Sequence, residues 1–360
     1  MIWLYMIIFS AFSIFCLFGF WIRWQWNKNY QEKRKFFQIH DISVIIPFRN
    51  EVNNLPNLIQ SLNKLVVFPR EIIFVNDHSE DDFKPCFNEL NVPFKISLIN
   101  LAPGDEGKKT ALRAGISDAI GEFILTWDAD IVVKPNFFSQ LAKTPVSDLL
   151  ILPVSMPGKN LKQFFFELDF QYLNALNTAI SGHTKPIAAN GANLLFNKAI
   201  FEEIDSFDDH ADVASGDDSF LLLDFKNHQK TIELALNPDL QVKTPIPTTW
   251  EGIINQRLRW IGKSKKVGDR FANYLAIFGL IYHVGFWLMF LTDATWNQLT
   301  ILFYWKILLD GLLIFPYLRI LKRSWLALFI PVFSMIYPIY MLMILVMTLF
   351  YEPEWKGRSI

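Results

Sequence analysis

Long runs of apolar residues lie toward both ends of this chain. Residues 2–22 contain no charged side chain, and residues 271–292, 299–318 and 325–351 form three further runs. At about 1.5 Å per residue, a helix of about 20 residues crosses a hydrocarbon core about 30 Å thick. The pattern therefore predicts four membrane spans. The first run lacks the flanking features of a cleaved signal peptide, so it is predicted to be a retained anchor.

Basic side chains flank the polar segment between these runs, residues 28–269. They are Arg23, Lys28, Lys33, Arg34 and Lys35 before it, Lys263, Lys265, Lys266 and Arg270 at its end, and Arg319, Lys322 and Arg323 between the third and fourth runs. The positive-inside rule predicts a multi-pass protein of the plasma (inner) membrane whose polar segment is cytoplasmic. Because Lys356 and Arg358 do not fit this topology, the last run, with Pro331 and Pro338, is predicted to be re-entrant or kinked.

The third run carries two ionisable residues, Lys306 and Asp310, four positions apart on one helix face. Ionisable side chains at membrane depth are functional candidates by default. A pair that neutralises itself among neighbouring helices gives the same pattern. The sequence leaves both explanations open.

Short β-branched runs alternate with amphipathic stretches through the first half of the polar segment. The strand-like runs are residues 42–47, 71–75, 96–101 and 123–127, and the helical stretches are residues 51–65 and 108–120. This alternation predicts an α/β fold in which helices cover a parallel sheet. Ligands of such sheets bind beyond the carboxyl ends of the strands, where this chain has Asn76-Asp77-His78 and Asp128-Ala129-Asp130.

The composition and the motifs that the sequence lacks exclude several classes of protein and of reactive site. Hydrophobic residues make up 52% of the chain and charged residues 19%, which is too apolar for a single soluble domain. A net charge of −1 gives no general attraction for nucleic acid, and two cysteines supply neither a disulfide framework nor a structural zinc site. Gly107-Lys108 is not a phosphate loop, because Lys109 follows it in place of Ser or Thr. The chemistry is therefore expected from carboxylates.

Two pairs of acidic residues are the candidates. In an extended backbone, Asp128 and Asp130 point the same way, and such oxygen ligands suit Mg²⁺ or Mn²⁺ shared with a diphosphate; Asp-x-Asp is also common in exposed turns. Asp217 and Asp218 open a helical stretch, where acids cap the helix or where one of them acts as a general base. One base and one metal suffice for sugar transfer from a nucleotide diphosphate.

A basic amphipathic stretch, residues 250–266, precedes the second apolar run. Gln256, Arg259 and Trp260 lie about one helical turn apart in it, which suits contacts with phosphate or sugar hydroxyls. A helix that lies on anionic headgroups has the same composition.

Together these residues resemble the family 2 glycosyltransferases, whose nucleotide-sugar-binding domain has the GT-A fold, a Rossmann-like α/β fold. The match is ordered and spans most of the polar segment. The matching segments are Ile45-Ile46-Pro47-Phe48-Arg49-Asn50-Glu51, Val75-Asn76-Asp77-His78-Ser79, Gly107-Lys108-Lys109-Thr110-Ala111-Leu112, Asp128-Ala129-Asp130, Gly191-Ala192-Asn193, Asp218 and Gln256-Arg257-Leu258-Arg259-Trp260. Each segment alone is weak, but the combination is specific.

The resemblance implies a role for each of these residues in a metal-dependent hexosyltransferase that inverts the anomeric carbon. It implies that Asp218 is the catalytic base and that Asp130, with Asp128, binds the metal, Mg²⁺ or Mn²⁺. The residues implied to contact the nucleotide-sugar are Pro47, Arg49, Glu51, Asp77, Lys108 and Asp128. Those implied to contact the diphosphate or the acceptor are Asp217, Gln256, Arg259 and Trp260. The family often has Glu where Asp217 stands, and a smaller residue and an aromatic where Phe48 and Arg49 stand.

The sequence as a whole divides the chain into four predicted ranges. They are an anchor at 1–26, a cytoplasmic GT-A domain at 38–248, an amphipathic interfacial helix at 249–270 and a C-terminal membrane region at 271–351. A UDP-sugar is the expected donor. Four spans are few for a polymer-exporting channel, so a membrane lipid or lipid-linked glycan is the expected acceptor, cradled by residues 161–176 unless that stretch is an ordinary buried helix.

Several other functions remain alternatives. A processive polysaccharide synthase shares the Gln-x-x-Arg-Trp signature, whereas a polyprenyl-phosphate sugar transferase is disfavoured by it. A non-catalytic nucleotide-binding membrane module would not need Asp218. A transporter is remote, because the spans show no inverted repeat.

Overall fold

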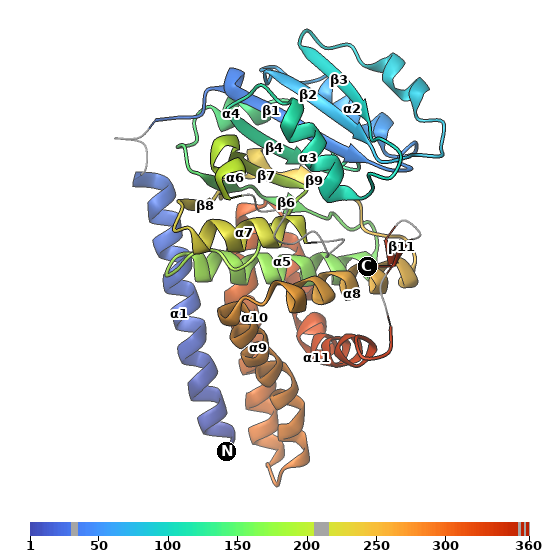
Figure 1. Cartoon of the computed structure of the whole chain (residues 1–360). Helices are drawn as coiled ribbons and strands as arrows, with labels where there is room; N and C mark the ends of the chain where they lie inside the picture. The colour runs from blue at the N-terminus through green and yellow to red at the C-terminus, as the bar shows by residue number, and fades with distance from the viewer. Residues whose placement is uncertain (30–34, 205–215, 352–353, 356–357, 360) are drawn as a thin grey trace. The chain divides into compact units, whose positions relative to one another are not determined.

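The computed structural model describes residues 1–29, 35–204, 216–351, 354–355 and 358–359 (Figure 1). The flanking cations Lys33, Arg34 and Lys356 lie outside these residues. The chain forms two compact units. A helical unit comprises Met1–Trp26, Pro157–Ile187 and Ile246–Pro353, and a sheet unit comprises Asn27–Met156, Ala188–Pro245 and Glu354–Ile360.

Within the described residues, seven strands of the sheet unit form one sheet, in the order β3-β2-β1-β4-β7-β5-β8. Their bounds are β1 Ile42–Phe48, β2 Glu71–Asn76, β3 Lys95–Asn100, β4 Phe123–Trp127, β5 Leu149–Ile151, β7 Asn193–Asn197 and β8 Ile232–Leu234. The short strands β6 (Val154–Ser155) and β9 (Val242–Lys243) pair separately. The predicted strands are therefore all present, within about one residue of their expected limits.

The first half of the sheet is parallel, as predicted. β1, β2 and β4 are buried along their whole length, which is why they read as continuous β-branched and aromatic runs. The helices α2 (Leu55–Leu62) and α3 (Lys108–Asp118) follow β1 and β3, and α3 packs on β1 and β2. At Gly115 an added Cβ would lie 2.5 Å from Ile45 Cγ2, so glycine allows α3 to approach the sheet closely.

The second half of the sheet, where the alternation predicted no strand, is not parallel throughout. β7 runs antiparallel to both β4 and β5, which makes the sheet mixed. Residues 157–187, which belong to the helical unit, separate β6 from β7 along the chain. β7 therefore does not return through a standard β-α-β crossover, and local periodicity carries no sign of its direction. The remaining helices of this unit are α4 (Phe137–Leu141), α6 (Lys198–Ile204) and α7 (Asp217–Asn227).

A buried carboxylate joins the amino-terminal ends of the strands. Glu71 begins β2 and accepts hydrogen bonds from Ser43 Oγ (2.7 Å), Lys95 Nζ (2.7 Å) and the Ile120 backbone N–H (2.9 Å). Burial alone would raise the pKa of Glu71, but these donors outweigh burial and hold the pKa below its ordinary value. Glu71 thus links β1, β2, β3 and the turn before β4.

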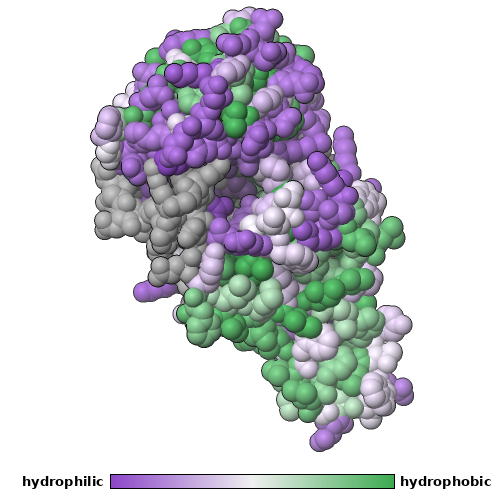
Figure 2. Space-filling view, turned by 90° about the vertical axis from the view of Figure 1, so that its right-hand side faces the viewer, coloured by the Kyte–Doolittle hydropathy of each residue, from purple (hydrophilic) through white to green (hydrophobic). Residues whose placement is uncertain are grey.

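The helical unit contains α1 (Ile2–Asn29), α5 (Leu161–Ser181), α8 (Trp250–Val267), α9 (Arg270–Leu288), α10 (Trp296–Ile320) and α11 (Ile330–Met347). Within the described part of the chain, four segments are long and apolar enough to cross a membrane. They are Ile2–Gln25, Arg270–Leu291, Trp296–Ile320 and Ser324–Met347. Figure 2 shows hydrophobic residues gathered over the surface of these helices, as expected for side chains that face lipid.

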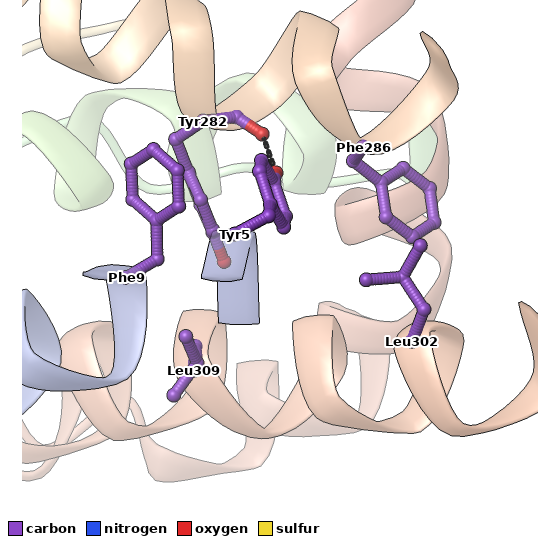
Figure 3. Packing of buried hydrophobic residues seen from close by; sticks show 6 residues of the cluster. All are labelled: Tyr5, Phe9, Tyr282, Phe286, Leu302 and Leu309. Carbon is purple, nitrogen blue, oxygen red and sulfur yellow. Dashed lines mark hydrogen bonds between the residues drawn. The ribbon is translucent and has the colours of Figure 1, made fainter. Parts of the chain in front are cut away.

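The first helix is a packed member of this bundle. Tyr5 and Phe9 of α1 lie among Tyr282 and Phe286 of α9 and Leu302 of α10 (Figure 3). The Tyr5 hydroxyl donates a hydrogen bond to the Tyr282 carbonyl oxygen. Farther along α1, an added Cβ at Gly19 would lie 2.0 Å from the Ala179 carbonyl oxygen of α5, so the two backbones touch there. The predicted anchor is thus also an integral part of the helical unit.

The membrane-depth pair forms an ion pair inside the bundle. Lys306 Nζ lies 2.7 Å from Asp310 Oδ2, and both side chains are 1% exposed. The Tyr282 hydroxyl donates to Asp310 Oδ1 (2.9 Å), and His283 Nδ1 lies 3.3 Å from Lys306 Nζ. This geometry favours the self-neutralising explanation. In the last apolar run, the 3-10 helix η6 (Ser324–Phe329) precedes α11; Pro331 lies in the first turn of α11, and Pro338 lies inside α11 without ending it.

Helix α5 differs from its predicted place. Residues 157–187 were expected inside the GT-A range 38–248, but they form part of the helical unit. The physical reason is that α5 packs against α10 and α11 and buries two carboxylates, Glu167 and Asp169, each paired with an arginine of this unit. The stretch 161–176 is therefore largely a buried helix, with Leu161 and Leu173 among its exposed positions.

We expect Glu71→Gln to destabilise the protein by about 1–3 kcal/mol at pH 7, because donors buried around Glu71 lose a charged acceptor. Urea unfolding of the detergent-purified chain measures this. The folded-state pKa of Glu71 lies below the unfolded value of about 4.3, so its contribution is present above that pH and is lost as pH falls through the folded pKa. Glu203→Gln, in the exposed pair with Lys230, is the control and should cost less than about 0.5 kcal/mol. An equal cost for both variants would contradict the prediction.

We expect Asp310→Asn to destabilise the helical unit by about 3–5 kcal/mol, because it leaves the Lys306 ammonium buried without its counter-charge. The double variant Lys306→Met with Asp310→Leu removes both charges and should recover most of this loss. Thermal unfolding in detergent distinguishes the two. A double variant as unstable as the single one would show that the pair contributes more than mutual neutralisation.

Candidate active site

The candidate site lies at the carboxyl ends of β1, β2 and β4. The chain leaves β1 and β2 through Asn50 (φ 53°) and His78 (φ 51°), two non-glycine residues in the left-handed region. Such conformations are uncommon and cluster where a fold constrains a functional loop. The chain turns at these two residues. Arg49, Glu51 and Asp77 therefore lie close to the ends of β1 and β2.

Reciprocal hydrogen bonds join these two loops. Arg49 Nη1 donates to the Asp77 carbonyl oxygen (3.0 Å), and the Glu80 N–H donates to Asn50 Oδ1 (2.8 Å). The Val52 N–H donates to Asp81 Oδ2 (2.7 Å). The loop after β1 and the loop after β2 are therefore held together, next to Pro47 of β1, which pairs in register with Val75 of β2.

Asp77 also holds the start of α3. Its Oδ2 accepts a hydrogen bond from the Gly107 N–H (3.2 Å). Gly107 has a φ of 97°, a conformation that favours glycine, and it directly precedes Lys108, the first residue of α3. The predicted residues Asp77 and Lys108 are thus positioned by the same turn.

Lys108 connects carboxylates that are distant in sequence. Its Nζ lies 2.6 Å from Asp128 Oδ1 and 3.5 Å from Asp217 Oδ2. Burial would lower the pKa of Lys108, but the charges of Asp128, Asp217 and Asp218 raise it above its ordinary value. The lysine is therefore a fixed positive charge among these acids.

Asp217 and Asp218 occupy the first turn of α7, as predicted. The preceding Gly216 has a φ of 102°, which allows the helix to start abruptly. Asp218 Oδ2 accepts a hydrogen bond from the Gly191 N–H (3.0 Å). A Cβ at Gly191 would lie 2.9 Å from Asp217 Oδ2, so glycine lets the 190–192 loop reach both acids.

The backbone at Asp128 and Asp130 differs from the prediction. β4 ends at Trp127, and Ala129 and Asp130 lie in a turn rather than an extended strand. The two carboxylates still influence each other: burial, then Asp128 and Glu51, raise the pKa of Asp130 to about 7. Thr244 Oγ1 donates to Asp130 Oδ2 (3.1 Å), a partner that no pattern in the sequence indicated.

The acids at Asp128 and Asp130 fit a divalent cation. Asp130 Oδ1 is buried, and within the described residues it has no hydrogen-bond partner. A cation beside it would satisfy that oxygen and offset the repulsion from Asp128 and Glu51. No group of three or more His, Cys, Asp or Glu side chains among the described residues is arranged to hold a metal. The protein thus offers two carboxylates, and a bound molecule would supply further ligands.

The Gln-x-x-Arg-Trp residues lie on α8, in the helical unit. Gln256, Arg259 and Trp260 are partly buried, and Trp260 packs against Phe170 of α5 at a ring distance of 5.6 Å. The helix begins as predicted at Trp250, where Thr249 Oγ1 accepts from the Gly252 N–H (3.1 Å). The structure thus brings the nine other predicted site residues together in the sheet unit and places these three in the helical unit.

Comparisons with known proteins bear on the family and the fold of this chain. The model of Glycosyl transferase family 2 matches residues 43–200, and that of Glycosyl transferase family group 2 matches residues 123–352, more than half of the chain. Among solved structures, a mannosyltransferase from Pyrobaculum calidifontis, in complex with GDP-Man and Mn²⁺, has a TM-score of 0.54 at 16% identity. The match covers 94% of this chain and 99% of that one. This likeness shows the fold.

Curated relatives cover shorter stretches. A poly-beta-1,6-N-acetyl-D-glucosamine synthase of Staphylococcus epidermidis is 22% identical over 65% of this chain and 57% of its own length. An undecaprenyl-phosphate 4-deoxy-4-formamido-L-arabinose transferase of Yersinia enterocolitica is 32% identical over 29% of this chain and 33% of its own length. The chain thus spans between about a third and three fifths of these two relatives. With the family models, the mixed sheet and the acids at its strand ends in agreement, the chain belongs to the family 2 glycosyltransferases and has their GT-A fold.

Proposed function

We propose that this protein is an inverting glycosyltransferase that moves a sugar from a nucleotide-diphosphate sugar to a membrane lipid or lipid-linked glycan at the cytoplasmic face of the plasma (inner) membrane. One observation carries the proposal. Lys108 draws Asp128, at a predicted donor-binding strand end, toward Asp217, which neighbours the predicted base Asp218. The carboxylate proposed to contact the donor, Asp128, and the one next to the proposed base, Asp217, therefore both lie beside Lys108.

The paired loops after β1 and β2 support a nucleotide at this edge of the sheet. Arg49, Glu51 and Asp77 offer hydrogen-bond donors and acceptors on a backbone that is already ordered. A UDP-sugar is the donor that we propose, and a GDP-sugar is the alternative, since the Pyrobaculum mannosyltransferase was solved with GDP-Man.

Asp128 and Asp130 would hold the divalent cation, Mg²⁺ or Mn²⁺. When bound, such an ion supplies positive charge to the diphosphate leaving group, so no protein acid needs to protonate it. The Lys108 ammonium lies beside the same carboxylates and adds to this positive charge.

Asp218 would act as general base. The acceptor hydroxyl attacks the anomeric carbon and gives its proton to the Asp218 carboxylate, while the bond between that carbon and the diphosphate oxygen breaks. Attack from the face opposite the leaving group inverts the anomeric configuration. The Gly191 N–H and the Ser219 hydroxyl, 3.0 Å from Oδ2 and Oδ1 of Asp218, hold the carboxylate in place for this step.

The four apolar helices support an acceptor that resides in the membrane. A processive polysaccharide synthase is the second candidate, because the Staphylococcus epidermidis synthase matches 65% of this chain. A polyprenyl-phosphate sugar transferase is the third, because the Yersinia enterocolitica relative bears that name over a shorter match.

We expect Asp218→Asn to lower turnover by about 10²–10⁴-fold while leaving nucleotide binding within a factor of about three, because the amide keeps the shape of the side chain but accepts no proton. The measurement is nucleotide release by detergent-purified protein with a panel of UDP- and GDP-sugars, Mn²⁺ and crude membrane lipid. Lipid-stimulated release supports the lipid acceptor, and a growing saccharide without added lipid supports the synthase. Unchanged turnover would exclude Asp218 as the base and make Asp217 the next candidate.

We expect Asp130→Ala to abolish the Mn²⁺-dependent part of nucleotide binding, because one of two carboxylates at the proposed metal position is lost. Calorimetric titration of UDP and GDP, with Mn²⁺ and with EDTA, measures that part separately from catalysis. Asp148→Ala, which removes a carboxylate that accepts from the Thr231 backbone N–H and hydroxyl, is the matched control and should bind as the wild type. Equal metal dependence in both variants would place the cation elsewhere.

A further inference from the structure

The helix that carries the Gln-x-x-Arg-Trp residues also carries a buried arginine, Arg257, at the first unspecified position of that signature. Arg257 Nη2 lies 2.8 Å from Asp169 Oδ1 of α5 and 3.4 Å from the hydroxyl of Tyr337 of α11. The three residues belong to three different helices of the helical unit. The side chains of Arg257, Asp169 and Tyr337 therefore form a cluster that connects α8 to α5 and to α11.

This ion pair is almost completely removed from water. The side chains of Arg257 and Asp169 are 10% and 4% exposed. Burial would lower the pKa of Arg257, but Asp169 raises it above its ordinary value, so the guanidinium stays charged. Apolar side chains of similar volume often stabilise a fold as well as such a pair does. What the pair adds is one defined geometry, because a guanidinium and a carboxylate bond well in few orientations.

Helical geometry links that orientation to the signature residues. At about 100° per residue, Gln256, Arg259 and Trp260 fall within one arc of about 100°, and Arg257 lies next to that arc. A rotation of α8 about its axis that broke the contact of Arg257 with Asp169 would therefore also change the direction of the Gln256, Arg259 and Trp260 side chains. Trp260 is held from the same side: the Arg257 guanidinium lies 5.7 Å from its ring, and Phe170, the neighbour of Asp169, packs on it.

Neighbouring rings pack on both His283 and Tyr337, so the α11 side of the cluster is well packed. The Tyr337 ring packs edge-on against His283 at 4.8 Å, and His283 lies beside the Lys306 ammonium. Tyr337 also stacks on Phe333, one turn earlier on α11, at 4.5 Å. The hydroxyl next to Arg257 therefore belongs to a side chain that packed rings and a buried ion pair hold in place.

We propose that Arg257, fixed by Asp169 and Tyr337, is a positioning residue that sets the rotation of α8 and, with it, the orientation of Gln256, Arg259 and Trp260 within the helical unit. This inference rests on the proposed glycosyl transfer.

A second buried ion pair on α5 provides a matched control. Glu167, two residues before Asp169, accepts from Arg323 Nε (2.8 Å) and Nη2 (2.6 Å) and is fully buried. Arg323 directly precedes η6 and lies outside α8. Glu167→Gln and Asp169→Asn therefore remove equivalent charges from one helix, but only Asp169→Asn releases the helix that carries the signature.

The experiment compares these two variants in the full-length chain in detergent. We expect Asp169→Asn to lower kcat at least about tenfold, because small displacements of positioning groups cost about that much or more. Its unfolding temperature should fall no further than that of Glu167→Gln, whose kcat should stay near the wild-type value. Tyr337→Phe, a milder change, should give a smaller loss, and Arg257→Lys, which keeps the charge, should retain more activity than Arg257→Gln.

Hydrogen exchange of the α8 amides tests the same inference without any substrate. Exchange should be faster in Asp169→Asn than in the wild type, and unchanged in Glu167→Gln. Equal activity and equal exchange in the two variants would overturn the positioning role. If Asp218→Asn is inactive and Asp169→Asn behaves as Glu167→Gln does, the positioning role alone fails. If Asp218→Asn turns over normally, the proposed base assignment fails, and the exchange result still decides whether Arg257 holds α8.

Discussion

The sheet unit depends on the balance of charge around the Lys108 ammonium. The carboxylates of Asp128, Asp217 and Asp218 converge on it, and Glu51 adds further negative charge near Asp130. Without a central cation, acids brought together in this way would repel one another and open the loops that carry them. The positions of α3, α7 and the turn after β4 are therefore coupled through one side chain. Under the proposed function, the same concentration of negative charge would bind a divalent cation together with a diphosphate.

In the helical unit, too, opposite charges lie in contact, but there apolar side chains surround them. Charges buried among apolar helices are tolerated only as pairs. Arg257 and Arg323 pair with carboxylates of α5, which is distant in sequence, whereas Lys306 pairs with Asp310 of the same helix and contacts His283 of α9. A guanidinium and a carboxylate bond well in few orientations, so the two arginine pairs favour one arrangement of the elements that they join.

Local pattern was sufficient to predict the parallel half of the sheet, since each of its strands is a continuous buried run between turn residues. It also located the acids at the strand ends and at the start of α7. It did not indicate β7, whose antiparallel direction depends on where the chain returns from another unit. It left open whether residues 161–176 are a buried helix, because the burial of α5 depends on partners in α8 and after α10. The pairing of Lys108 with Asp217 and the contact of Thr244 with Asp130 are likewise tertiary, because more than a hundred residues separate the partners.

The close approach of Gly19 to α5 has a consequence for biosynthesis. The first helix emerges from the ribosome long before residues 157–187, and longer still before α9 and α10, which complete its surroundings. Until then its aromatic face has only lipid as a partner. The helical unit therefore closes late, from three separate parts of the chain, while the intervening parts fold into the sheet unit. Insertion into the membrane and folding of the sheet unit must therefore proceed side by side, because the two units are built from alternating parts of the chain.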